Sequence, residues 1–257
     1  MNRFNTFSLF ITLAVPTFFI NQTSTQLLEK IRSVNITRSD NLNAGDKVNL
    51  LVVSSTLCKQ QNAINTELSA QCTLTSRESE ELSQNSCYLE CVCNNETGSF
   101  IVNERKCGDE RVLRQGCSLV FGSWSWSTGW LWDSETDRLL VLYIEDGFGL
   151  QGGFNVSTAE YSACRYTSLS TYEAAGLWNA CTLPTNETFI TFFKMRGYWH
   201  FYWIIEDLSQ NKKSEIEGKF MKMDVTCENV NEENGIVEVT QLSSCLVFKV
   251  TGNISSK

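Results

Sequence analysis

The alternation of apolar and polar positions after residue 118 predicts strands. Residues 122–131 (GSWSWSTGWL) alternate aromatic with small polar side chains, the period-two pattern of a half-buried strand. Residues 138–144 (RLLVLYI) form a continuous apolar, β-prone run, which is typical of a strand covered on both faces. Because the segment between them, Asp133–Asp137, is a polar turn cluster, the two runs are expected to form a hairpin.

The same kind of pattern continues to the C-terminus. Further strands are predicted at 189–193, 198–205, 219–226, 236–240 and 245–250. Helices are predicted at 26–31, 64–83 and 171–180. Strands that do not alternate with helices favour a mainly β fold with curved antiparallel sheets, in a barrel or a sandwich with an apolar pocket. A small disulfide-stapled segment is expected to precede it.

The N-terminus predicts export. Residues 1–24 have the pattern of a secretory signal peptide, with Arg3 before an apolar run of 14 residues at 7–20 and small or polar residues at 23–25. The alternative is an N-terminal anchor, but a membrane span needs about 20 apolar residues. We therefore expect a secreted protein with no membrane span.

Composition narrows the class of protein. A hydrophobic content of 42% with 19% charged residues is typical of a globular chain. The net charge is −8, so we do not expect the chain to bind nucleic acid, whose phosphates need positive charge. Sequons for N-glycosylation, which would be used in a secreted protein, lie at Asn35, Asn95, Asn155, Asn186 and Asn253.

The cysteines divide the chain. An exported chain with 11 cysteines is expected to form disulfides, and the odd number leaves one unpaired or interchain, so that a disulfide-linked homodimer is one outcome. The first group is Cys58, Cys72, Cys87, Cys91, Cys93, Cys107 and Cys117; the second is Cys164, Cys181, Cys227 and Cys245. All seven Trp follow residue 118. We expect a signal peptide at 1–24, a cysteine-rich segment at 25–117 and a β-rich domain at 118–257.

The spacing of Cys91, Cys93 and Cys107 is similar to the end of an EGF-like module. Cys87 lies only three residues before Cys91, which does not fit that module, so a different disulfide-stapled structure is favoured. Connectivity does not follow from the sequence.

Candidate chemistry is sparse, and we expect no enzyme and no cofactor. His200 is the only imidazole, and the run YWHFYW predicts a packed or half-exposed strand histidine rather than a general base. The acids Asp133, Glu135 and Asp137 are spaced like the start of a calcium loop. An EF-hand would need Gly and Glu where Arg138 and Ile144 stand, so a solvated turn is preferred to a weak calcium site.

Aromatic residues give the remaining signal. They could fill a core, line an apolar cavity or form an exposed platform. The candidate ligand-binding residues are Trp124, Trp126, Trp130, Leu140, Leu142, Phe189, Phe193, Trp199 and Trp203.

Several motifs support one family resemblance. Trp132–Arg138 followed by Leu-Leu-Val-Leu-Tyr, together with 160–164, 183–189 and Asp224–Cys227, resembles the ependymin-related proteins over about 117–245. The resemblance implies a secreted glycoprotein with two curved antiparallel sheets, a deep apolar pocket, lipid-like ligands, calcium binding and dimerisation. A lipocalin-type barrel, with Gly122-x-Trp124 in its first strand, is the alternative.

Two functions follow as expectations. The first is a secreted, N-glycosylated protein that binds an apolar, lipid-like small molecule in its β-rich domain. The second is an extracellular protein-interaction factor, of a matrix, host-directed or venom type, that acts through its disulfide-rich segment.

Overall fold

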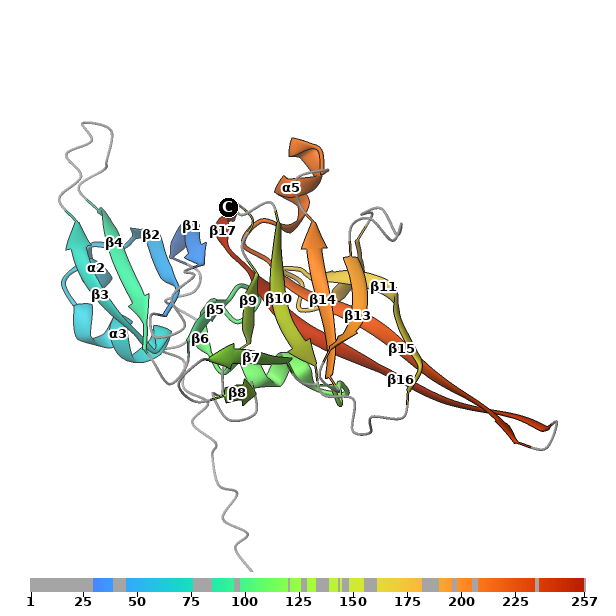
Figure 1. The fold of residues 1–257 in the computed structure, drawn as a ribbon. Coiled ribbons are helices and arrows are strands. Elements are labelled where there is room, and N and C mark those ends of the chain that lie inside the picture. The colour runs from blue at the N-terminus through green and yellow to red at the C-terminus, as the bar shows by residue number, and fades with distance from the viewer. Residues whose placement is uncertain are drawn as a thin grey trace, which may run out of the picture.

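The computed structural model describes most of the chain after the predicted signal peptide as β-structure (Figure 1). The described residues are 30–38, 45–75, 85–94, 98–119, 121–125, 129–132, 139–142, 144, 148–154, 161–181, 190–195, 198–204, 208–233 and 236–256. Their strands form three five-stranded sheets and one two-stranded sheet. The helices of this part are short, and none is long and apolar enough to cross a membrane.

The first sheet lies at the N-terminal side of the molecule, at the left of Figure 1. Its strand order is β17 (Gly252–Ser256), β1 (Ile31–Arg38), β2 (Lys47–Val53), β4 (Ser86–Cys93) and β3 (Ala70–Thr75), with antiparallel neighbours throughout. Helices α2 (Ser55–Cys58) and α3 (Gln61–Leu68) connect β2 to β3. Val48, Leu50 and Val52 alternate into a core that also takes Ile64 and Leu68 of α3. The last strand of the chain therefore completes the first sheet.

A short linking region follows this sheet. Strands β5 (Ser99–Ile101) and β6 (Lys106–Gly108) pair with each other, and a 3-10 helix, η1, spans Glu110–Arg114. Ile101 and Leu113 pack with Leu139, Phe220 and Val247 of the C-terminal half. This second small core joins the cysteine-rich segment to the rest of the molecule.

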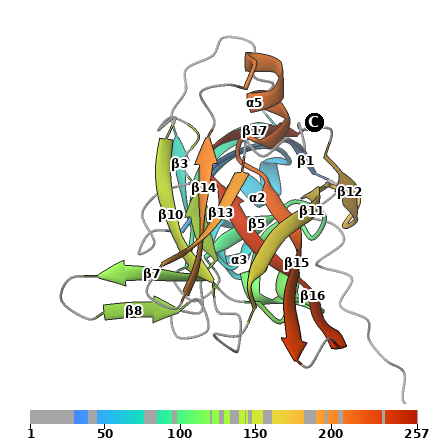
Figure 2. The ribbon, with the colours of Figure 1, turned by 45° about the vertical axis from the view of Figure 1, so that its right-hand side comes forward.

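Two sheets pack against each other in the C-terminal half (Figure 2). One has the order β13 (Ile190–Met195), β14 (Tyr198–Ile204), β10 (Phe148–Phe154), β7 (Phe121–Ser125) and β8 (Gly129–Trp132). The other has the order β12 (Trp178–Ala180), β11 (Ala163–Tyr172), β15 (Phe220–Glu233), β16 (Ile236–Val250) and β9 (Leu140–Leu142). Trp199 and Phe201 of the first pack with Met221, Met223 and Phe248 of the second. Helix α5 (Gln210–Ile216) leads from β14 to β15 and adds Ile216 to this core.

The predicted mainly β fold with antiparallel sheets is confirmed. Every strand pairing described is antiparallel except that of β9 with β16, and no sheet closes into a barrel within the described residues. The predicted strands at 189–193, 198–205 and 219–226 correspond closely to β13, β14 and the start of β15. Those at 236–240 and 245–250 are one strand, β16.

The predicted hairpin between 122–131 and 138–144 is wrong. Strands β7 and β8 pair with each other inside the first run, whereas β9 pairs with the distant β16. The apolar run is nevertheless covered on both faces, because Leu142 joins the core between the sheets and Leu139 joins the small core beside η1.

The helix predictions are also wrong in extent. Helix α3 covers only 61–68, since Ser69 takes a left-handed φ of 51° and Ala70 begins β3. The helix prediction at 171–180 is wrong, because these residues are the end of β11, a turn and β12. Ile31 begins β1, and residues 26–29 and 76–83 of the other two predictions lie outside the described residues. Tertiary pairing overrides local preference at these places: β3 is held in the sheet by β4, and β12 by β11.

Five disulfides link the predicted cysteines. The pairs are Cys58–Cys87, Cys72–Cys91, Cys93–Cys107, Cys117–Cys245 and Cys164–Cys227. The first three lie within the cysteine-rich segment, and Cys117 crosses to the last cysteine. Cys181, which is in none of these five disulfides, is half-buried against the core between the sheets.

Candidate functional site

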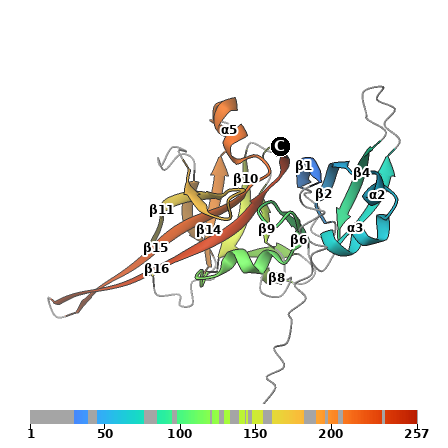
Figure 3. The same cartoon turned by 180° about the vertical axis from the view of Figure 1, so that it is seen from behind.

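The feature that departs most from a compact β protein is the long antiparallel pair of strands β15 and β16. The two strands pair without a register shift from Phe220–Lys249 at the base to Glu233–Ile236 at the far end. Strand β11 accompanies β15 only as far as Glu228, and β9 accompanies β16 only at 248–250. The far part therefore projects from the body, at the lower right of Figure 1 and the left of Figure 3.

We use the name ribbon for the projecting part, residues 229–233 and 236–240. Val230 and Val239 lie directly opposite each other in the register, and their exposed fractions are 54% and 57%. Glu238 and Thr240 beside Val239 are exposed too. An isolated two-stranded hairpin is marginally stable in water, and apolar side chains gain when they are covered. The ribbon thus presents an apolar pair on an element with no third strand among the described residues.

The sequence explains why a ribbon forms. Asn234-Gly235 stands between the polar run Asn231–Glu233 and the β-prone run Ile236–Val239, and Glu233 is the register partner of Ile236. Asn-Gly between alternating segments is the strongest short-range hairpin signal. The strand at 236–240 was predicted from the sequence and its partner at 229–233 was not, although this dipeptide indicates a partner.

The base of the ribbon is anchored firmly. Cys164–Cys227 joins directly opposite residues of β11 and β15, and Cys117–Cys245 ties β16 to the segment before β7. Ser118 N donates a hydrogen bond of 2.9 Å to Ser244 Oγ. Arg165, near the start of β11, pairs with Glu228 at 2.8 Å. A covalently fixed base restricts the directions that the ribbon can take.

The structure describes the predicted ligand-binding residues only in part, and their grouping in one site stays a prediction. Leu142 and Trp199 are buried in the core between the sheets, and Leu140 packs against it. Phe193 stacks on His200, 5.3 Å between ring centroids, on the opposite face of β13 and β14 from Phe201. The backbones at Trp124 and Trp130 are register partners in the β7–β8 hairpin, and Trp203 is a register partner of Ile190. Trp126 and Phe189 lie outside the described residues.

Trp199 carries one unusual feature. Its side chain is only 7% exposed, and its indole Nε1–H has no described acceptor within hydrogen-bond distance. A buried donor without an acceptor costs free energy, so such a group is usually met by water or a ligand. His200, the only histidine, is buried, as the packed-histidine prediction states.

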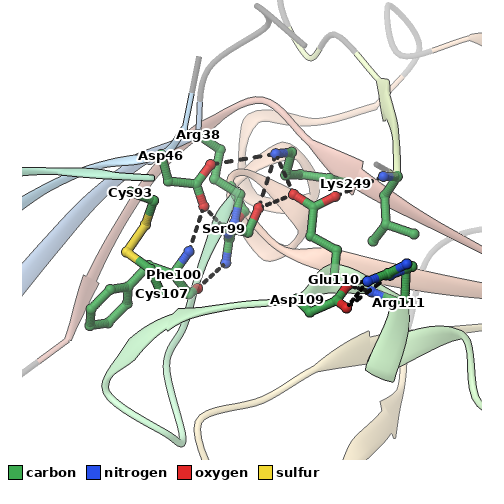
Figure 4. A network of polar contacts seen from close by, with 12 residues as sticks. Arg38, Asp46, Cys93, Ser99, Phe100, Cys107, Asp109, Glu110, Arg111 and Lys249 are labelled. Atoms are coloured by element: carbon green, nitrogen blue, oxygen red, sulfur yellow. Dashed lines mark hydrogen bonds and ion pairs between the residues drawn. A yellow bond between two sulfur atoms is a disulfide. The ribbon is translucent and has the colours of Figure 1, made fainter. Parts of the chain in front are cut away.

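A second candidate cluster is a buried network of charges (Figure 4). Lys249 Nζ lies 3.0 Å from Glu110 Oε1, 3.0 Å from Ser99 Oγ and 3.5 Å from Asp46 Oδ1. Arg38 pairs with Asp46 and lies over the Phe220 ring, 3.9 Å from its centroid. All five polar side chains are almost wholly buried.

This network is structural. Two cations balance two anions, and the Glu110 and Asp46 carboxylates also accept from the backbone N–H groups of Leu139 and Phe100. At the rim, the hydrogen bond from Arg111 holds the pKa of Asp109 below its usual value. The cluster fastens β1, η1 and β16 together.

The remaining predicted sites are partly described. Asn35 on β1 and Asn253 on β17 are exposed, and Thr37 Oγ1 donates to Asn253 Oδ1 at 2.8 Å. Asn95, Asn155 and Asn186 lie outside the described residues, as do the acids of the predicted calcium turn. Among the residues that are described, no group of three acids, histidines or cysteines could hold a metal.

Comparison with known proteins adds no relative: the chain matches no protein-family model, no curated protein and no solved structure. The resemblance to ependymin-related proteins therefore stays a prediction.

Proposed function

We propose that this chain is an extracellular protein-interaction factor that contacts another protein through the β15–β16 ribbon. The observation that carries the proposal is the pair Val230 and Val239, more than half exposed on a ribbon that extends beyond its neighbouring strands. Burying this pair under a partner would remove apolar surface from water and stabilise a marginal element at the same time.

The extracellular setting of the proposal rests on the disulfides. Five disulfides are typical of proteins that fold in an oxidising compartment. The signal peptide at 1–24 and glycans at the exposed Asn35 and Asn253 belong to the same proposal.

The proposal moves the contact away from the disulfide-rich segment that the sequence had favoured. Cys72, Cys91, Cys93 and Cys107 are buried in the core of the first sheet. Their bonds therefore stabilise that sheet, whereas the exposed apolar pair lies on the ribbon.

Photo-crosslinking tests the proposal. A benzophenone amino acid placed at position 239 is expected to capture a protein from the extracellular fluid of the source tissue. Val112, on η1, is 56% exposed and is the matched control position. A distinct adduct from 239 that is missing from 112 supports the proposal, and identical adducts or none from 239 count against it.

A second candidate function rests on Trp199. Its unsatisfied indole N–H lies in the apolar core between two sheets, where a lipid-like molecule with an oxygen acceptor would satisfy it. Titration with palmitate would then change the tryptophan fluorescence, and Trp199→Phe would weaken binding by about fivefold to tenfold, the worth of one hydrogen bond. No fluorescence change at saturating palmitate eliminates this candidate.

A further inference from the structure

We propose that the partner binds by adding a β-strand along the outer edge of β16 at 236–243, and that its segment carries Lys or Arg. This inference rests on the proposed function, since it names how the partner meets the ribbon. Its evidence is the free edge of the strand, the residues that form this edge and the charge around it.

The first observation is an open edge. One side of β16 pairs with β15 along its whole length. On the other side, β9 pairs only with 248–250, and Cys117 and Ser118 hold 244–245. No strand of the described chain pairs with 236–243 on that side. Alternate backbone N–H and C=O groups of an edge strand point outward, ready to pair with an extended segment.

The second observation is that nothing in this edge prevents pairing. Natural sheets protect their edges with Lys, Pro, bulges or very short strands. Residues 236–243 read IVEVTQLS, with one charge, no Pro and no Lys, and the register with β15 has no bulge. Four of the eight residues are β-branched, which favours an extended strand. An open, β-prone edge is a site for strand addition.

The third observation selects the partner's charge. Residues 228–241 hold Glu228, Glu232, Glu233 and Glu238 and no Lys or Arg. Arg165 already pairs with Glu228. A second copy of this chain would bring equal acidic ribbons together in a molecule whose net charge is already −8, and such pairing is unfavourable. A cationic segment is attracted instead.

The register also suggests a pattern for that segment. Glu238 and Val239 are successive residues of one strand, so they face opposite sides of the ribbon. A strand added beside them would place apolar residues next to Val239 and basic residues next to Glu238. The preferred partner therefore alternates apolar and basic residues.

Two synthetic peptides test this inference on the full chain. One is a blocked ten-residue peptide that alternates Lys with Val, and its control alternates Glu with Val at equal strand propensity. Hydrogen exchange is expected to slow at 236–243 with the Lys peptide and not with the Glu peptide. Glu238→Lys should weaken the Lys peptide by about twofold to fivefold at low salt, whereas Glu90→Lys on the exposed face of β4 should not.

Three results overturn the inference. They are no protection at saturating Lys peptide, protection at 229–233 in its place, and a dimer in sedimentation that protects 236–243 without peptide. If any of these occurs while the partner cross-linked at position 239 still binds, strand addition by a basic segment fails and the proposed function stands. If no protein is cross-linked at position 239 and the Lys peptide still protects 236–243, the edge accepts a basic strand, and the proposed function fails.

Discussion

Lys249 is one residue on which the stability of this molecule depends. Its ammonium group is buried with Asp46 and Glu110, and the three groups come from distant parts of the chain. A buried ion pair adds little when it is compared with apolar residues, but removal of one partner strands the other charge.

Lys249→Met should therefore lower the free energy of unfolding by about 3–5 kcal/mol, because the buried Glu110 carboxylate loses the cation that it pairs with, while Asp46 keeps Arg38. The measurement is denaturant unfolding followed by tryptophan fluorescence. Lys212→Met, in a partly exposed surface pair with Glu215, is the control and should change stability by at most about 1 kcal/mol. Equal effects of the two substitutions would contradict the account of the network.

Glu67 provides a pH prediction. Burial raises the pKa of this carboxyl above 4.5, and its Oε1 has no hydrogen-bond partner among the described residues. In the folded state the carboxyl holds its proton more tightly than in the unfolded state, so stability falls as pH rises from 4.5 through the folded pKa. Glu67→Gln should raise stability at pH 7 by at most about 0.5 kcal/mol, because solvent screens this partly exposed carboxyl, with no gain below that window.

Unfolding curves at pH 4 and pH 7 measure this. Glu90→Gln, at an exposed position of β4, is the control. A Glu67→Gln gain of the same size at both pH values would show that ionisation is not its cause.

At the scale of the elements, the sequence predicted the strands of the C-terminal half better than their partners. A period-two pattern marks β7, and apolar, β-prone runs mark β13 and β14, but which strand β9 joins depends on contacts more than 100 residues away. Sequence patterns are local, whereas pairing is decided by burial of both faces. The same limit explains why the helix predicted at 64–83 is too long, since α3 ends at Leu68.

The candidate site was less predictable than the fold. Among the tryptophans of the predicted site, only the Trp199 side chain is described, and it lies in the core between the sheets, so the predicted aromatic site stays a prediction. The length of the projecting part depends on how far β11 and β9 extend beside β15 and β16. The sequences of β15 and β16 do not predict that extent. Asn234-Gly235 predicts a hairpin but not that its far part stands alone.

The pairing of β17 with β1 gives an element-scale prediction. Ile254 packs against the core of the first sheet, while its neighbour Ser255 is exposed. Ile254→Asp should lower stability by about 1–3 kcal/mol, since a charge replaces a packed side chain, and Ser255→Asp should change it by less than about 0.5 kcal/mol. Thermal unfolding of both variants measures the difference. Similar melting temperatures would mean that β17 does not support the sheet.

For the whole molecule, the predicted boundary at residue 117 is bridged in three ways. Cys117 bonds to Cys245, β17 pairs with β1, and the buried network joins Arg38 to Lys249 through Asp46. The two halves therefore depend on each other, and the ribbon base is tied to the segment that links them.

One whole-molecule prediction concerns the exposed sequons. If the chain is secreted, Asn35 and Asn253 will carry glycans side by side on the first sheet, because both are exposed and Thr37 is the register partner of Asn253. Asn35→Gln and Asn253→Gln should each remove one glycan from the intact mass of protein from eukaryotic cells. Masses that do not change on either substitution would contradict glycosylation there.

The central claim is that the ribbon binds a protein partner, and the most direct test is the affinity of the protein cross-linked at position 239. Biolayer interferometry with the purified partner would compare the wild type, Val230→Asp/Val239→Asp and the matched control Val112→Asp. We predict that the double variant binds at least about tenfold more weakly at an unchanged melting temperature, while the control stays within about twofold. Equal affinity of the folded double variant and the wild type would contradict the claim.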